Sequence, residues 1–192
     1  ELTSLEFDPD IELKENEYSV KFDDRDFQNV FFDYETTTEG EFHEEYLVKC
    51  SCIEKTFYGK DCGRQMLFAL TALFPERNLR LIAHNAAYDF RFIMKHLCCI
   101  KPITRGKMLL KADARFYYAK GKSIDIEIQD SYALIPDRLA NFGKMFDLTV
   151  CKEILPYGLY TKVNVDRRLI PEDECIVACK NQFRSNNIGN TQ

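Results

Sequence analysis

Phe-Phe-Asp-Tyr-Glu-Thr-Thr-Thr, residues 31 to 38, ends an apolar run with two carboxylates two positions apart and three threonines behind them. Successive side chains of a strand point to opposite faces, so Asp33 and Glu35 share one face and Tyr34 enters the other layer. Two carboxylates on one face form a partial ligand set for Mg²⁺ or Mn²⁺, which prefer oxygen donors. An Asp-x-Glu pair is also common at a solvated strand edge or as an N-cap, so the stretch alone leaves both interpretations open.

The length and composition of the chain predict one domain. With 192 residues, 45% of them apolar, it can bury a sizeable core. No apolar run reaches the roughly 18 residues that cross a bilayer, and the acidic first residues do not resemble a signal or transit peptide. We therefore expect an intracellular protein with no membrane partner. Because the chain starts with Glu1 and not with Met, we also expect a fragment or a processed product.

Charge and cysteine spacing narrow the function classes. A formal charge of −5 argues against a domain that grips duplex DNA. The eight cysteines form no Cys-x-x-Cys pair and no Cys/His quartet, and no second pair completes Cys175 and Cys179. We expect reduced, mostly buried thiols in a reducing compartment, and neither disulfides nor zinc.

Hydrophobic periodicity predicts strands and helices in alternation. We expect strands at 30–35, 45–53, 79–83, 115–119 and 123–129, and helices at 66–74, from 86 to about 97, and at 137–146. This order is typical of an α/β fold in which helices flank a sheet. Residues 1–29 are predicted to form an N-terminal arm or a leading strand, before a single domain at 30–192.

A second polar motif, His-Asn-Ala-Ala-Tyr-Asp-Phe-Arg-Phe at 84–92, follows a predicted buried strand and enters a helix. Asp89 falls in the first helical turn, where an acid commonly complements the helix dipole. If the helix instead delivers Asp89 to the sheet end that carries Asp33 and Glu35, three carboxylates could hold two cations about 4 Å apart. Such a pair of ions activates a water for attack on phosphorus and neutralises the leaving oxygen.

The order of motifs resembles a known family. Residues 32–38 resemble the Exo I motif, and residues 84–92 the Exo II motif, of the proofreading 3′ to 5′ exonuclease in family B DNA polymerases of the protein-primed, organellar and viral branch. Asp-Ser-Tyr-Ala-Leu-Ile-Pro at 130–136 is similar to the branch's Asp-Ser-Leu-x-x-h-Pro segment, with Tyr132 in place of Leu. Residues 144–152 resemble the stretch that brings a lysine near the active site. The four motifs follow one another within roughly residues 30 to 160.

This resemblance implies an RNase H-like mixed β-sheet flanked by helices, of the DEDD exonuclease superfamily. It implies Asp33, Glu35 and Asp89 as catalytic ligands of Mg²⁺ or Mn²⁺, and Lys152 as a catalytic residue against the scissile phosphate. It implies that the single-stranded 3′ DNA end is held by Thr36, Asn85, Tyr88, Phe92, Ser131 and Tyr157. The implied partners are the polymerase domain of the parent protein and a terminal protein primer.

Some of these positions have an equally ordinary explanation. For Phe92, Ser131 and Tyr157, packing in the core or a turn is at least as common a role as DNA binding. His84 is expected to be structural.

The Exo III motif of this family, Tyr-x-x-x-Asp, is missing after residue 160. In one interpretation, Ala178 and Gln182 stand at its two positions and the site is degenerate. In the other, residues 171–183 form the preceding helix, and the domain is truncated before Exo III, which lies beyond Gln192 in the parent protein. Either way one carboxylate is lacking, so we expect the isolated chain to be a weak or inactive enzyme. The alternative function is a catalytically dead nucleic-acid or protein-binding scaffold.

A basic, aromatic segment at 101–122 has seven lysines and arginines against one acid, Asp113. It could guide a single strand or the terminal protein. It could equally be a solvated hairpin whose aromatic residues Phe116, Tyr117 and Tyr118 face the core. The sequence leaves both interpretations open.

Overall fold

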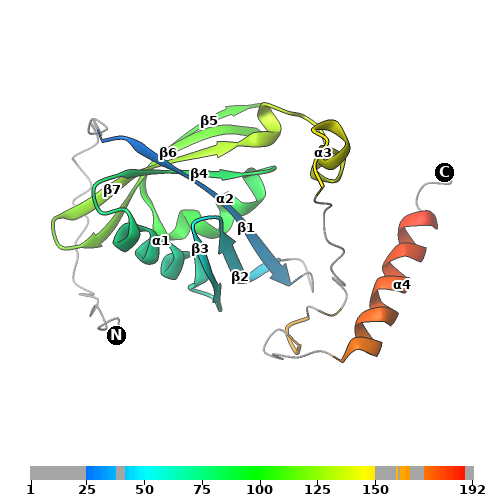
Figure 1. The fold of residues 1–192 in the computed structure, drawn as a ribbon. Coiled ribbons are helices and arrows are strands. Elements are labelled where there is room, and N and C mark those ends of the chain that lie inside the picture. Colours follow the sequence, from blue (N-terminus) through cyan, green and yellow to red (C-terminus); the bar gives the residue numbers. More distant parts are fainter. Residues whose placement is uncertain (1–24, 38–41, 150–158, 160, 165–170, 189–192) are drawn as a thin grey trace.

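The computed structural model describes residues 25–37, 42–149, 159, 161–164 and 171–188, with the backbone alone for 182–188. Within these residues one seven-stranded sheet has the order β3-β2-β1-β4-β7-β6-β5 (Figure 1). The strands are β1 (Phe27–Thr37), β2 (Glu44–Cys50), β3 (Ile53–Tyr58), β4 (Asn78–Ala83), β5 (Cys98–Arg105), β6 (Met108–Ala119) and β7 (Lys122–Asp130). The helices are α1 (Cys62–Leu73), α2 (Ala87–Ile93), α3 (Leu139–Met145) and α4 (Glu172–Ile188), with short 3₁₀ turns η1 (Met94–His96) and η2 (Ser131–Ala133).

The sheet is mixed. Its centre is parallel, because β4 runs parallel to both β1 and β7. β2 and β3 extend it antiparallel beyond β1, and β6 and β5 extend it antiparallel beyond β7. The predicted α/β fold class, an RNase H-like mixed sheet with flanking helices, is confirmed. Because β1, β4 and β7 are parallel, the residues that follow them leave the sheet at one edge.

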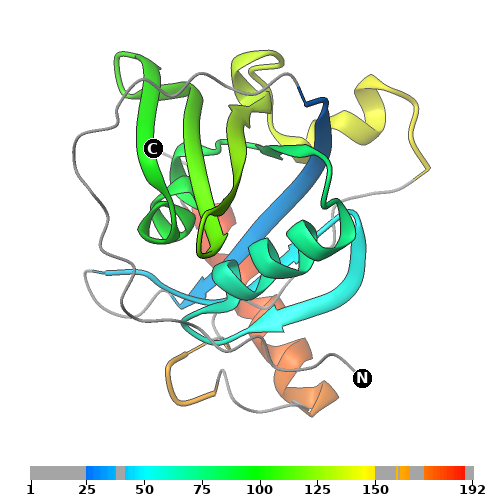
Figure 2. The same cartoon turned by 90° about the vertical axis from the view of Figure 1, so that its left-hand side faces the viewer.

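The hydrophobic core lies between the sheet and the helices α1 and α2. Both helices lie on the same side of the sheet (Figures 1 and 2). Val30, Phe32 and Tyr34 of β1 are buried, whereas Phe31 and Asp33 between them are exposed. Leu81 of β4 also belongs to this core. The alternation predicted for residues 31–35 is therefore confirmed, and Asp33 lies on the face that the core leaves free.

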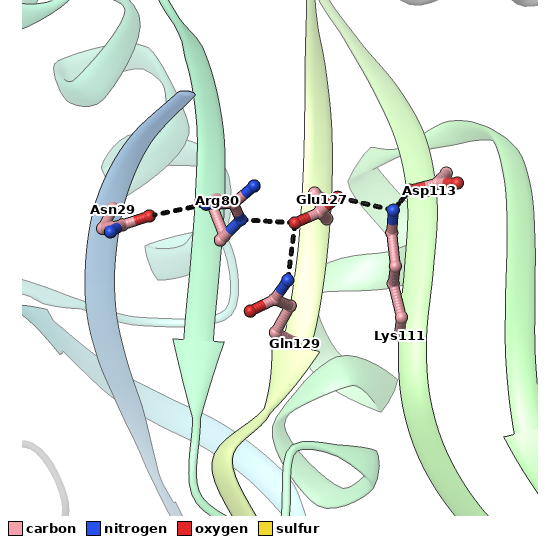
Figure 3. A network of polar contacts seen from close by, with 6 residues as sticks. All are labelled: Asn29, Arg80, Lys111, Asp113, Glu127 and Gln129. Carbon is pink, nitrogen blue, oxygen red and sulfur yellow. Dashed lines mark hydrogen bonds and ion pairs between the residues drawn. The ribbon is translucent and has the colours of Figure 1, made fainter. Parts of the chain in front are cut away.

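The opposite face of the sheet carries a network of charged side chains (Figure 3). Glu127 of β7 accepts hydrogen bonds from Arg80 and, at 2.7 Å, from Gln129, and forms an ion pair of 2.5 Å with Lys111 Nζ. Arg115 Nε forms a second ion pair, 2.7 Å from Asp125 Oδ1. Two of the seven basic residues of segment 101–122 are thus neutralised by acids of β7.

The aromatic residues of segment 101–122 divide between core and surface. Phe116 is buried and Tyr118 packs against the core, as the hairpin interpretation predicts. Tyr117 is exposed, so that interpretation is wrong at this position. The five remaining basic residues of the segment are exposed: Lys101, Arg105, Lys107, Lys120 and Lys122.

Several predicted boundaries need correction. The strand predicted at 45–53 is wrong beyond Cys50, because a turn at 51–52 reverses the chain into β3. The helix predicted to reach residue 97 ends at Ile93 and continues only as η1. β5 was not predicted. β1 begins at Phe27, inside the segment 1–29 that was predicted to precede the domain, and residues 1–24 lie outside the described part.

The thiols are less buried than predicted. All seven cysteines in the described part are free, which agrees with the expectation of reduced thiols. Only Cys50 and Cys62 are buried, and the other five are half-buried. The prediction of mostly buried thiols is wrong because those five lie in a turn, on the edge strand β5 or on α4.

No helix of the described residues is long and apolar enough to cross a membrane.

Candidate functional site

The site begins where β1 exchanges one neighbouring strand for another. From Phe27 to Phe31, β1 pairs with β4, and the last pair joins Phe31 to Ile82. From Phe32 to Thr37 it pairs with β2 instead. We call residues 32–37 the β1 overhang, because β4 no longer covers the edge of β1 there. Asp33 and Glu35 both lie in this overhang.

Asp89 of α2 binds the edge of β1 that β4 leaves uncovered. The backbone N–H of Tyr34 donates a hydrogen bond of 3.0 Å to Asp89 Oδ1, although the two residues stand 55 positions apart in the sequence. Asp89 is only 3% exposed. The structure therefore brings the Exo I-like and Exo II-like motifs into direct contact, and Asp89 lies in the first turn of its helix as predicted.

The environment of Asp89 disfavours its charged form. Burial raises the pKa of Asp89 to about 7, and the negative charges of Asp33 and Asp130 add to the rise, while the Tyr34 N–H opposes it. Asp33 is thus near enough to interact electrostatically with Asp89. A carboxyl whose pKa is raised by burial and by a second acid is a candidate functional group.

Asp130 is a second buried carboxylate, at the end of β7 and 2% exposed. Its Oδ1 accepts hydrogen bonds of 2.9 Å from the backbone N–H groups of Asn85 and Tyr132. Asn85 has a φ of +65°, a left-handed conformation that Asn tolerates better than most residues. Asp130 thereby fixes the turn that leads from β4 into α2. Sequence reasoning assigned it no role, although it is the first residue of the matched segment 130–136.

Ser131 and His84 hold the neighbouring loops together. The Ser131 hydroxyl lies 3.0 Å from His84 Nδ1 and 3.2 Å from the Ala83 carbonyl oxygen. His84 Nε2 donates to the Asp137 carbonyl oxygen at 2.8 Å. These contacts agree with the structural role expected for His84. They also give Ser131 a role in a turn, one of the two explanations that the sequence left open.

Tyr88 connects α2 to the β1 overhang. Its hydroxyl lies 2.5 Å from Thr36 Oγ1 and 2.6 Å from His43 Nδ1. The Phe92 ring packs against Tyr88 and Tyr34, with centroid distances of 5.2 and 5.5 Å. Phe92 is buried in the core, whereas Asn85 is exposed. Thr36 and Tyr88, two residues predicted to bind DNA, are therefore in direct contact.

The remaining predicted residues are only partly placed. Glu35 is half-buried in the overhang. Lys152 and Tyr157 lie outside the described residues. Residues 178 and 182 both lie within α4, so the two interpretations of the missing Exo III motif stay open.

The described residues do not form a metal site as they are placed. Asp33 and Asp89 interact electrostatically. However, no three His, Cys, Asp or Glu side chains of the described part lie close enough together to hold an ion. In the described part, the arrangement brings two interacting carboxyl groups together without a complete ligand set.

The chain belongs to a family whose model is described as DNA polymerase type B, organellar and viral, which matches residues 70–182. The resemblance inferred from the motifs is thus confirmed. No curated protein matches the chain.

Three solved structures of Phi29 DNA polymerase have a similar fold. With primer-template DNA and incoming nucleotides, the polymerase is 19% identical over 88% of this chain, with a TM-score of 0.53. With single-stranded DNA, the polymerase is 20% identical over 88% of this chain, with a TM-score of 0.52. With primer-template DNA alone, it is 19% identical over 85% of this chain, with a TM-score of 0.54. The chain covers 32% of each polymerase chain, about a third of its length.

Proposed function

We propose that this chain is the 3′ to 5′ proofreading exonuclease domain of a protein-primed family B DNA polymerase, and that the β1 overhang holds the single-stranded 3′ end of DNA. The hydrogen bond from the Tyr34 N–H to Asp89 Oδ1 carries the proposal, because it unites two distant acidic motifs in a member of this family. The structures of Phi29 DNA polymerase with primer-template DNA and with single-stranded DNA support the choice of ligand.

The proposed contacts to DNA follow from the chemistry of the overhang. The hydroxyls of Thr36 and Tyr88 and the amide of Asn85 can bond phosphate or sugar oxygens, which positions a strand without reading its sequence. Ser131 and Phe92 act indirectly in this proposal, since one holds a turn and the other packs against Tyr88. Lys152 and Tyr157 keep the roles that the resemblance implies for them.

Catalysis belongs, in this proposal, to the intact parent protein. Asp33, Glu35 and Asp89 are the proposed ligands of Mg²⁺ or Mn²⁺ for two-metal hydrolysis, together with a carboxylate that this chain lacks. Since no three ligands lie together in the described part, we assign no hydrolysis to the isolated chain. The polymerase domain and a terminal protein are the proposed partners.

The incomplete set of metal ligands in the described part favours one alternative function. A domain of this family that has lost a ligand could still bind nucleic acid or protein as a scaffold. Both functions predict binding of a single strand at the overhang, and they differ in whether nucleotides are released.

The test measures binding of a 5′-labelled single-stranded oligonucleotide with a free 3′ hydroxyl, by fluorescence anisotropy in EDTA. Tyr88→Phe removes one hydroxyl, and Asn85→Gly removes the amide while tolerating the left-handed backbone. We expect each variant to raise the dissociation constant about 3- to 10-fold, the value of one or two hydrogen bonds. Tyr58→Phe is the matched control, because Tyr58 is exposed on the far edge strand β3.

Failure of the unmodified chain to bind the oligonucleotide, or equal binding by all variants, would contradict the proposal. Adding Mn²⁺ to the intact parent protein, to which the proposal assigns catalysis, then separates the two functions. Release of nucleotides that Asp33→Ala abolishes identifies an exonuclease, whereas binding without release favours the scaffold.

A further inference from the structure

A hollow of about 400 Å³ lies beside Tyr88, lined by Phe42, His43, Arg91 and Phe92. We propose that it binds one nucleotide of the DNA strand, with the base stacked on Phe42 and the phosphate held by Arg91. The proposal rests on the proposed function, and it adds a subsite that none of the matched motifs assigns. The volume falls in the usual range of small-ligand pockets.

Arg91 supplies the chemistry that recognises a phosphate. Its guanidinium carbon lies 4.9 Å from the centroid of the Tyr88 ring, a cation–π contact that orients the group. A planar guanidinium with several donors can bind two phosphate oxygens at once. Among the residues that the structure describes, the lining contains no Asp or Glu, although the whole chain carries a net charge of −5.

Phe42 and His43 supply the chemistry that recognises a base. Phe42 is 78% exposed, so its ring is available to an incoming planar group. Stacking of a base on an aromatic ring contributes about 1–3 kcal/mol and tolerates any sequence. The His43 ring lies edge-to-face with Tyr88 at 5.8 Å, and its Nδ1 is bound to the Tyr88 hydroxyl. His43 is thus fixed in place as one wall of the hollow.

The Tyr88 hydroxyl joins this hollow to the β1 overhang. It contacts Thr36 of the overhang on one side and His43 of the hollow on the other, at 2.5 and 2.6 Å. A strand whose end lies at the overhang would therefore place a neighbouring nucleotide in the hollow. A nucleotide unit combines an anion with a planar apolar group, and the lining combines an arginine with aromatic rings. A free nucleoside monophosphate has the same chemistry, so the experiment must separate the two sources.

The first arm measures oligonucleotide binding by anisotropy in EDTA over a range of salt concentrations. We expect Arg91→Ala to raise the dissociation constant about 5-fold or more and to reduce the slope of log affinity against log salt by about one. We expect Phe42→Ala to raise it about 5- to 100-fold through lost stacking. Arg91→Lys should keep the salt slope and lose part of the affinity. Arg77→Ala, which removes an exposed arginine bonded to Gln28, is the control and should bind like the unmodified chain.

The second arm titrates dTMP into the full chain and follows the ring signals of Phe42 and His43 by NMR. If the unmodified chain binds the oligonucleotide while Arg91→Ala and Phe42→Ala bind it equally well, the subsite is overturned and the proposed function survives. If the unmodified chain binds no oligonucleotide, the proposed function fails. In that case, dTMP binding still tests the hollow: signal shifts that Arg91→Ala abolishes would support the hollow as a mononucleotide site. If dTMP shifts neither ring signal, the hollow is overturned as a nucleotide site as well.

Discussion

The two halves of β1 differ in which groups form hydrogen bonds with their backbone. Residues 27–31 pair with β4 along a parallel ladder, and Val30 among them belongs to the core. Residues 32–37 pair with β2 and turn the other edge toward α2, where the carboxylate of Asp89 accepts the Tyr34 N–H. A strand that extends beyond the end of its neighbour leaves backbone N–H groups that side chains can bind. Both halves contribute to the core, through Val30 in the paired half and through Phe32 and Tyr34 in the overhang, and the overhang also contributes the candidate site.

The ladder that pairs β1 with β4 should be sensitive to a loss of buried side-chain volume. Leu81 of β4 lies opposite Val30 in the ladder and is fully buried. Leu81→Ala should lower the free energy of unfolding by about 2–5 kcal/mol, measured by urea denaturation, because it removes buried methyl groups and leaves a cavity. Ile82→Ala, on the opposite face and only half-buried, is the control and should cost less. Equal losses would contradict the assignment of the core to one face.

The overhang should instead respond to pH through Asp89. Its pKa rises from 3.8 in the unfolded chain to about 7 in the folded one, chiefly through burial. The folded state therefore binds more protons between these values, and this group's stabilising contribution is lost as pH rises from about 4 to 7. Asp89→Asn keeps an acceptor for the Tyr34 N–H and removes the charge. It should raise stability at pH 8 by roughly 2–4 kcal/mol and leave it nearly unchanged at pH 4.

Urea denaturation at both pH values measures this difference. Asp61→Asn, at an exposed acid before α1, is the control and should show no such trend. A gain for Asp89→Asn that is the same at pH 4 and pH 8 would refute the raised pKa.

Sequence reasoning recovered the overhang well because its information is local. The period-two alternation at 31–35 identified the strand and its two faces, and the helical start at 87 placed Asp89 in the first turn. Contact between the two motifs could only be inferred from the resemblance. It depends on β4 ending at Ala83 while β1 continues, which no local pattern encodes.

The sequence did not predict the edge strand β5 or the residues that line the hollow. β5 carries Pro102 and several exposed residues, so its composition resembles a loop. Phe42 and His43 are adjacent in the sequence, but only the fold brings them to Arg91. Asp130 is the first residue of the matched segment 130–136. Its position at the end of a buried strand could have indicated a role at the site.

Close packing beneath the overhang gives a smaller effect. A Cβ at Gly63 of α1 would lie 1.9 Å from the Tyr34 hydroxyl oxygen, so Gly63→Ala should lower the free energy of unfolding by about 1–3 kcal/mol. In the described part of the chain this hydroxyl is buried without a hydrogen-bond partner. Tyr34→Phe removes it and should restore most of the loss in the double variant. Additive losses in a denaturation cycle would show that the two groups do not touch.

The smallest effect on stability is expected at Asp33 itself. Asp33 is exposed, so Asp33→Ala should change the free energy of unfolding by no more than about 0.5 kcal/mol. Removing its charge should nevertheless lower the pKa of Asp89, which a ¹³C NMR titration of the Asp89 carboxyl measures. The pKa should remain above 3.8, because burial is the larger cause. An unchanged pKa would place the two carboxyls too far apart to act together.

Binding of a free 3′ end at the β1 overhang can be followed residue by residue in an NMR titration. The ¹⁵N-labelled chain is titrated in EDTA with a linear single-stranded oligonucleotide and, separately, with a circular one of the same sequence. We expect the linear strand to shift the amide signals of Tyr34 and Asn85, and the circle to shift them far less because it has no end. Equal shifts with both strands, or shifts that leave these two amides untouched, would contradict this binding.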